Sequence, residues 1–450
     1  MLISTISKLR FDVLASYARS PLMASVGVEV EWFEVEGTPI IGALILDRDG
    51  QYSAAVLAPD LAERYRGVRH TNFHGTPQEA VADLANTIAG VVPELESERV
   101  QGDEPLAPVD LFTPVRSFER LHPSFVQLTQ NAGWAAARTV IEHMMRWYDD
   151  VDGNFVEQFQ TTAFDPRVWE LYLFATLTEA GYTLDRTNPM PDFVAVGPQA
   201  TLALEATTVN PRVIDGQSEP DPPSDTKEER IRYVRDYMPI RYAGPLTAKL
   251  KKKYWEREHV RGLPLVFAIQ DFHEPRSMSW SGSSLAIYLY GLFHEAVPTE
   301  DGTVKVEPQK VIKHRWGTKD VPSNFFELPD AENVSAVIHN SSGTLSKFNR
   351  MGVSAGFGSP DVQLIHSGLA ADHDPDAVTP TRFSRVVGEG YEEAWMTGMD
   401  VFHNPHAAVP LDFDAFPGAA HHVLVPDGTV QSTIPEWHPL SSINAIIVAT

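Results

Sequence analysis

Between residues 154 and 270, the sequence contains a series of segments whose apolar periodicity changes from helical to strand-like, and their order limits the possible folds. Apolar side chains first recur at helical spacing and stop at Gly181, a residue typical of a helix C-terminus. The last segment is almost wholly apolar, as expected of a strand covered on both faces. The predicted elements are a helix over 154–181, strands over 192–196 and 201–209, a basic helix over 245–258 and a buried strand over 263–269. This order predicts an α/β (α+β) core in which helices flank a sheet.

Units of different character flank this core. Residues 27–57 contain three strand-like runs separated by turn residues, which predicts a small antiparallel sheet. Thr76 followed by Pro77 predicts the capped start of a helix. The polar, proline-rich segment 211–226 is predicted to be a mobile insertion in the core. We therefore expect an N-terminal β/α unit over 1–105, the core over 106–275, and a C-terminal α/β unit over 276–450 whose fold and role are not assigned.

The 450-residue chain contains no cysteine, which excludes disulfides, thiolate zinc sites and cysteine nucleophiles. Any metal site must therefore use carboxylates and histidines. Residues 1–26 mix charged and apolar side chains and lack the apolar core of a signal peptide. No stretch is long and apolar enough to span a bilayer, so we expect no membrane partner and a cytoplasmic location.

The formal net charge of -24 argues against a surface that binds nucleic acid everywhere, because such binding depends on neutralising phosphates with Lys and Arg. Basic residues do outnumber acidic ones locally, between Lys227 and Arg261. The segment Lys249–Lys253 is the most basic part of this region and a candidate contact for nucleic acid. A solvated helix face explains the same charges equally well. A homodimer or a partner protein also stays open.

Three carboxylates of the predicted core are candidates for a metal site. Glu170 lies in the first predicted helix, Asp192 begins one strand, and Glu205 lies near the end of the next. Adjacent strands can bring Asp192 and Glu205 to one end of a sheet, where both side chains would reach one hard cation. Mg²⁺, or Mn²⁺ in its place, suits a site with few carboxylates whose other positions hold water or phosphate oxygen.

The residues Glu170, Pro191-Asp192-Phe193 and Leu204-Glu205-Ala206-Thr207 resemble the PD-(D/E)XK nuclease superfamily. The resemblance covers about a quarter of the chain. It implies a restriction-endonuclease-like mixed sheet, metal-dependent endonuclease activity on DNA or RNA, and a role in bacterial defence or restriction. It also implies that Asp192 and Glu205 bind the metal and that Glu170 assists.

The chain departs from the family pattern at Thr207, where the family has a lysine that positions or activates water. Threonine can hydrogen-bond a water or a phosphate oxygen but carries no charge. Active family members are known in which this lysine is replaced or has moved to a neighbouring helix, and Lys249, Lys252 and Lys253 are candidates for that role. Of these, we single out Lys249 and Lys253. Their spacing of four places them on one face of the predicted helix. The alternative is a catalytically inactive nuclease-like scaffold that binds nucleic acid or a partner protein.

Each carboxylate also has a structural interpretation. A helical glutamate such as Glu170 is usually solvated, and Asp192 after a proline can simply start a strand or a turn. Glu205 is harder to explain in this way, because a carboxylate within an apolar strand is costly without a partner.

Other patterns in the sequence indicate weaker candidates. Gly352-Val-Ser354-Ala-Gly356 matches a serine nucleophile elbow, but its flanks lack the required strand and helix, so a glycine-rich loop is the preferred interpretation. Asp271 and His273 follow the buried strand and are secondary site candidates. Candidates for a second metal site are His403, His406, His421, His422 and His438. Candidates for a phosphate-binding run, with a solvated loop as the alternative, are Asn340, Ser341, Ser342, Lys347, Asn349 and Arg350.

Overall fold

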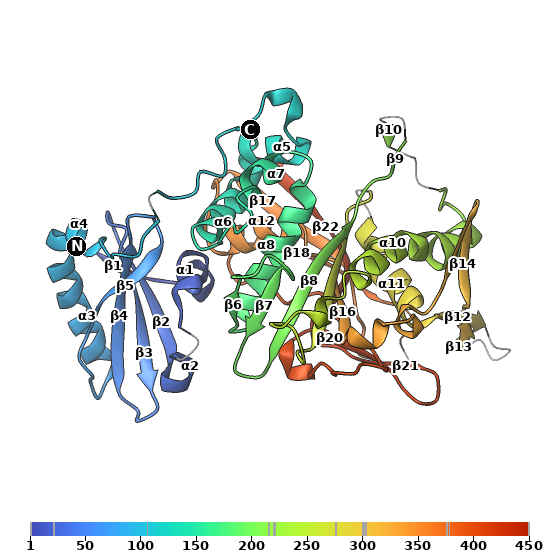
Figure 1. Cartoon of the computed structure of the whole chain (residues 1–450). Coiled ribbons are helices and arrows are strands. Elements are labelled where there is room, and N and C mark those ends of the chain that lie inside the picture. The colour runs from blue at the N-terminus through green and yellow to red at the C-terminus, as the bar shows by residue number, and fades with distance from the viewer. Residues whose placement is uncertain are drawn as a thin grey trace.

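The computed structural model describes most of the chain and shows an α+β architecture with two main sheets (Figure 1). The described residues are 2–20, 23–105, 107–214, 217–218, 222–274, 277–298, 304–374, 377 and 379–448. Within them, no helix combines the length and the apolar character needed to span a bilayer.

The N-terminal unit is a five-stranded antiparallel sheet with helices on both faces (Figure 1, blue). Its strands are β1 (Ile3–Ile6), β2 (Gly27–Val35), β3 (Ile41–Asp47), β4 (Tyr52–Pro59) and β5 (Tyr65–His70). Its helices are α1 (Lys8–Ala15), α2 (Met23–Val26), α3 (Pro77–Val91) and α4 (Leu95–Glu98). The three predicted strands are confirmed, with β1 and β5 added at the edges. The predicted helix start is also confirmed, because the Thr76 side chain accepts a hydrogen bond from Glu79 N.

The central sheet has eight strands in the order β21-β20-β19-β16-β11-β8-β7-β6. These strands are β6 (Thr183–Asp185), β7 (Phe193–Val196), β8 (Thr201–Val209), β11 (Leu265–Asp271), β16 (Ala336–Asn340), β19 (Met399–His403), β20 (Ala420–Leu424) and β21 (Val430–Thr433). The strands β6, β7 and β8 run antiparallel, whereas β8, β11 and β16 are mutually parallel. The sheet is therefore mixed. Every residue of β11 is buried, which confirms the prediction of a buried strand there.

Helices cover both faces of this sheet. One face packs against α8 (Phe164–Glu179), and the other packs against α10 (Met238–Leu250) and α11 (Ser281–Tyr290). Successive side chains of β8 point to opposite faces of the sheet, so Leu204 lies on the face covered by α8 and Ala203 on the face covered by α10. The predicted helix over 154–181 is two helices, α7 (Phe155–Gln160) and α8. A break is compatible with Pro166, because proline fits the first turn of α8 better than a helix interior.

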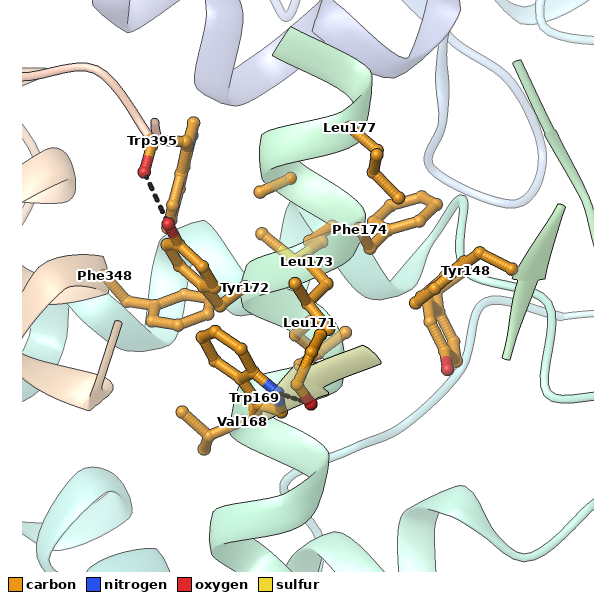
Figure 2. Packing of buried hydrophobic residues seen from close by; sticks show 14 of the residues in the cluster. Tyr148, Val168, Trp169, Leu171, Tyr172, Leu173, Phe174, Leu177, Phe348 and Trp395 are labelled. Atoms are coloured by element: carbon orange, nitrogen blue, oxygen red, sulfur yellow. Dashed lines mark hydrogen bonds between the residues drawn. The ribbon is translucent and has the colours of Figure 1, made fainter. Parts of the chain in front are cut away.

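Large aromatic side chains anchor α8 to its surroundings. Trp169 Nε1 donates a hydrogen bond to Ala268 O of β11 at 3.2 Å, and Tyr172 OH donates to Trp395 O at 2.9 Å. Figure 2 shows Tyr172 pointing toward Trp395, with Tyr148 on the other side of the helix. The orientation of α8, and of any group on it, is thus set by contacts from distant parts of the sequence.

The prediction of a basic helix over 245–258 is wrong about both the start and the end of the helix. The chain is helical from α9 (Lys227–Arg232) through a π-helical turn, η5 (Tyr233–Tyr237), to the end of α10 at Leu250. Pro245 lies inside α10, not at its start, and Lys253 has a left-handed φ of 48° after the helix has ended. Before α7, the chain forms two further helices, α5 (Pro123–Gln130) and α6 (Ala135–Met145).

The C-terminal part of the chain completes the central sheet. The strands β16, β19, β20 and β21 all follow residue 276, and β16 pairs directly with β11. The expected boundary between residues 275 and 276 therefore separates strands of one sheet; those two residues lie outside the described part. The remaining elements are the hairpins β12 (Leu292–Pro298)–β13 (Val304–Lys310) and β14 (Lys313–Trp316)–β15 (Lys319–Pro322), helix α12 (Leu345–Ser354), and the sheet of β17 (Val362–Ala370), β18 (Thr381–Val387) and β22 (Pro439–Val448).

The segment 211–226, predicted to be a mobile insertion, is only partly described. Residues 215–216 and 219–221 lie outside the described residues. The described part contains the short pair β9 (Val213–Ile214) and β10 (Gln217–Ser218). The segment leads directly into α9.

Candidate functional site

The pairing of β7 with β8 brings two of the predicted acids together. Phe193 lies opposite Leu204, so Asp192 and Glu205 are the next residues on each strand. Asp192 N lies 3.3 Å from Glu205 Oε2, to which it donates a hydrogen bond, and Ala206 N donates to Asp192 Oδ2 at 2.7 Å. The two carboxylates are therefore held by the sheet itself, at the place where the sequence predicts a metal site.

Lys249 reaches this pair from α10. Glu205 is on the side of β8 that faces α10, and its Oε1 forms an ion pair with Lys249 Nζ. The Glu205 side chain is only 3% exposed, and that of Lys249 is 20% exposed, so this contact is shielded from water on one side and open on the other. Lys249 thus places a positive charge beside Glu205. Thr207, which lies two residues after Glu205 on the same face of β8, carries no such charge.

Glu170 is close to Asp192 but its carboxylate is already engaged. Its Oε1 accepts hydrogen bonds from Tyr148 OH and from Arg186 Nη2, the latter at 3.2 Å. Its Oε2 accepts one from Arg167 Nη1 at 2.5 Å. Glu170 and Asp192 line one small cavity of about 30 Å³, which is the space of about one water molecule. Glu170 therefore lies in the wall of the site, with its negative charge balanced by two guanidinium groups.

The residues that engage Glu170 are absent from the sequence predictions. Arg167 precedes Glu170 by three residues on α8, a spacing at which helical side chains meet, so the pattern contained a signal for this pair. Arg186 follows β6, and its guanidinium lies 4.0 Å from the centroid of the Tyr148 ring. No sequence spacing relates Tyr148, Arg186 and Glu170, so only the fold reveals this contact.

Lys253 does not join the site. Its Nζ lies 3.3 Å from Asp330 Oδ2 and 3.8 Å from Glu256 Oε1. The prediction that Lys249 and Lys253 share a helix face is wrong, because α10 ends at Leu250 and the backbone turns away before Lys253.

The electrostatics of the site centre on Asp192. Burial, and then the negative charges of Glu205 and Glu170, raise the pKa of Asp192 to about 7, although Lys249 acts in the opposite direction. Two adjacent carboxylates with one ammonium group leave a site that favours additional positive charge. A bound cation would relieve this repulsion and would compete with the proton on Asp192.

The site offers two carboxylates to a Mg²⁺ ion, those of Asp192 and Glu205, because that of Glu170 is already bound. In the described part of the chain, no group of three or more His, Cys, Asp or Glu side chains is arranged to hold a metal ion, and Glu170 is bound to arginines as described above. Mg²⁺ commonly takes only one or two carboxylates and completes its shell with water and phosphate oxygens. Asp192 and Glu205 are a pair of that kind.

The other predicted residues lie elsewhere and have structural partners. Asp271 Oδ1 is 2.6 Å from His273 Nδ1, and Asp271 Oδ2 accepts hydrogen bonds from Tyr242 and Ser281. This network is fully buried at the end of β11. Ser354 is the last residue of α12 and not part of a strand-to-helix elbow, nor of the loop that the sequence suggests.

The predicted histidine candidates divide into two hydrogen-bonded groups. His403 Nε2 lies 2.9 Å from His421 Nδ1, and the ring of His421 also contacts Phe416 O. His422 Nε2 and His438 Nε2 lie 3.0 Å and 3.1 Å from Asp400 Oδ1. His406 is not part of either group. The histidines do not converge on one centre.

The predicted phosphate-binding run is buried, and it is not a solvated loop. Arg350 binds Glu393 through two hydrogen bonds of 2.7 Å each, and Lys347 Nζ lies 3.2 Å from the same carboxylate. Asn349 donates to Gly133 O. Hydrogen bonds within the chain also engage the side chains of Asn340 and Ser341, and Ser342 Oγ lies 3.4 Å from Ser442 Oγ. The side chains of Lys347, Asn349 and Arg350 therefore hold α12 in place, and the polar groups of the run are engaged within the protein.

The comparisons found no matching family model, no matching curated protein and no matching solved structure.

Proposed function

We propose that this protein is a metal-dependent nuclease and that residues 164–271 form its PD-(D/E)XK nuclease-like unit. The order α8, β7, β8, α10, β11 is the one that the sequence resemblance implies, with β6 as an additional antiparallel strand. Asp192 and Glu205 lie side by side in this unit. Support for the proposal comes from the residues of this chain and their geometry.

One observation carries the proposal: the ammonium group of Lys249 contacts Glu205 from the helix that follows the two catalytic strands. The motif position for a lysine is occupied by Thr207, and a nuclease site without a cation there would lack a group to bind the scissile phosphate. Lys249 restores that group from another element. Three parts of the sequence, β7, β8 and α10, thus supply the charges that phosphodiester hydrolysis needs in one place.

Asp192 and Glu205 would hold Mg²⁺, and the ion, when bound, would polarise a phosphoryl oxygen and lower the pKa of an attacking water. Lys249 has three N–H donors, so it can bind Glu205 and still donate a hydrogen bond to a phosphate oxygen or to that water. Arg167 and Arg186 fix Glu170 and shape the wall of the cavity next to Asp192.

The proposed substrate is DNA or RNA. Lys251 and Lys252 follow directly after α10 and are exposed close to Lys249 in sequence, where they can contact backbone phosphates on either side of the scissile bond. A role in bacterial defence or restriction is an analogy with the superfamily.

The proposal is tested by incubating the purified protein with single- and double-stranded DNA and RNA in Mg²⁺ or Mn²⁺. We expect cleavage of at least one substrate, which EDTA abolishes. Asp192→Ala and Glu205→Ala should each reduce the rate by at least about 10²-fold, because each removes a ligand of the ion that stabilises transition-state charge.

A matched control is Glu256→Ala, an exposed glutamate in the short turn that follows the end of α10. It should leave cleavage unchanged. Cleavage that survives Asp192→Ala would contradict the proposed site. Absence of cleavage with every substrate would favour the alternative of a scaffold that binds nucleic acid without cutting it, for which the engagement of Glu170 by two arginines is the supporting observation.

A further inference from the structure

A second cavity lies between the N-terminal unit and α8, away from the proposed nuclease site. Its volume is about 570 Å³, within the range of about 300–1,000 Å³ that is usual for small-molecule sites. Its walls come from α1, β2 and the segment between them on one side, and from α8 and β6 on the other. Figure 1 shows α1 on the side of the blue unit that faces the central sheet. Junctions between structural units are common places for ligand sites.

Aromatic side chains form much of the wall of this cavity. They come from five separate positions in the chain, namely Tyr17, Trp147, Phe174, Tyr182 and Trp395. Tyr17 and Phe174 stack on each other with ring centroids 5.0 Å apart and an interplanar angle of 7°. The Tyr182 hydroxyl donates a hydrogen bond to Ala415 O, so the ring of Tyr182, and not its hydroxyl, is available to a ligand in the cavity. Rings present negative faces to a ligand.

Glu179 adds a carboxylate to these aromatic walls. It is the last residue of α8, and its Oε2 accepts a hydrogen bond from Met396 N at 3.1 Å. Burial raises the pKa of Glu179, although its side chain remains open to the cavity. Among the described residues, no salt bridge joins Glu179 to a Lys, Arg or His side chain; Lys347, whose ammonium group is bound to Glu393, lies close enough for its charge to lower the pKa of Glu179.

The other charges at the cavity neutralise one another. Arg19 is bound to Glu29 and to Asp12, and Lys8 is bound to Asp12. The lining thus contains two cations and three carboxylates when Glu179 is included, a net of one negative charge. This balance disfavours an anionic ligand.

We propose that this cavity binds a small organic cation, an amine or quaternary ammonium compound with an apolar body, whose charged group lies beside Glu179 among the aromatic rings. A carboxylate attracts the charge, and ring faces stabilise ammonium groups through cation–π interactions. The apolar body would contact the aliphatic and aromatic side chains of the lining. The site is independent of the proposed nuclease activity, because neither Asp192 nor Glu205 lines it.

The proposal is tested by titrating the full-length protein with choline and benzyltrimethylammonium while following tryptophan fluorescence, to which Trp147 and Trp395 would report from the cavity wall. The neutral isostere of choline, 3,3-dimethyl-1-butanol, and benzoate serve as uncharged and anionic probes. We expect saturable binding of at least one cation at millimolar concentration or below, and binding at least about tenfold weaker for both other probes.

Glu179→Gln keeps the acceptor for Met396 N but removes the charge, and should weaken cation binding at least about tenfold while leaving the melting temperature of the ligand-free protein unchanged or higher. The control Glu96→Gln alters an exposed carboxylate and should have no effect. The proposal is overturned if neither cation saturates, if the neutral isostere binds as tightly as choline, or if Glu179→Gln binds the cations as well as the wild type does.

Discussion

Replacing Lys249 with methionine is expected to reduce Mg²⁺-dependent cleavage by about 10²–10³-fold, the usual loss when one donor to transition-state charge is removed. Methionine keeps the unbranched stem of lysine and removes only the ammonium group. The measurement is the single-turnover cleavage rate on the best substrate. Lys253→Met is the matched control, because Lys253 pairs with Asp330 outside the site, and it should leave the rate unchanged.

Lys249→Met also leaves Glu205 buried without its cation, so stability must be measured alongside activity. Lys249→Arg keeps the charge and should retain the fold and a larger part of the rate than the methionine variant. A folded Lys249→Met protein that cleaves at the wild-type rate would remove the lysine from the site. Equal losses in Lys249→Met and Lys253→Met would show that general attraction of nucleic acid, and not one positioned ammonium, is responsible.

The second large effect concerns stability. Glu393→Gln should lower the free energy of unfolding by about 3–5 kcal/mol, because the change breaks a buried ion cluster and leaves charge uncompensated. The side chains of Lys347, Arg350 and Glu393 are at most 1% exposed. Burial alone would raise the pKa of Glu393, but Arg350 and Lys347 hold that pKa well below its usual range. The glutamate is therefore ionised and is the carboxylate that both cations contact.

Denaturant unfolding followed by tryptophan fluorescence measures this loss, with Trp395 two residues from Glu393 as a nearby reporter. The control is Glu157→Gln, which breaks an exposed pair with Arg116 and should cost at most about 1 kcal/mol. If Glu393→Gln costs no more than Glu157→Gln, the cluster does not hold α12 in place. In that case the phosphate-binding interpretation of Lys347 and Arg350 would regain support.

Local patterns predicted the parts of the fold that depend on local chemistry. The three strands over residues 27–57, the cap at Thr76 and the buried strand β11 all follow from periodicity and turn residues. The helix ends were less well predicted, because Pro245 is accommodated inside α10 and Pro166 in the first turn of α8.

The C-terminal part, over 276–450, was left without an assigned fold for a different reason. Its strands β16, β19 and β20 are only five residues long and contain buried His, Asp and Asn side chains, as in Ala336–Asn340. The run over 334–338 is strand-like and overlaps β16, but no comparable periodicity or apolar run marks β19 and β20. Their partners are also distant in sequence, since β16 pairs with β11 about 70 residues earlier. Burial of these polar groups depends on hydrogen bonds that only the assembled fold supplies.

The part of the candidate site that lies on two adjacent strands could be predicted from the sequence. The proximity of Asp192 and Glu205 follows from their positions on β7 and β8, and Lys249 was named as one of two possible cations. The ties of Glu170 to Tyr148, Arg167 and Arg186 could not be foreseen as a set, because they join residues from separate elements. Those ties leave Asp192 and Glu205 as the two carboxylates that can take up the proposed metal ion.

The proposed divalent-metal site at Asp192 and Glu205 can be tested by a calorimetric titration with Mg²⁺ in the absence of nucleic acid. Asp192 with a pKa of about 7 is largely protonated at pH 6 and largely ionised at pH 8, so binding must displace its proton at the lower pH. We expect one Mg²⁺ per chain at pH 8, an apparent affinity about tenfold weaker at pH 6, and loss of binding in Asp192→Asn. Absence of Mg²⁺ binding at both pH values, or binding that Asp192→Asn leaves intact, would contradict the proposed metal site.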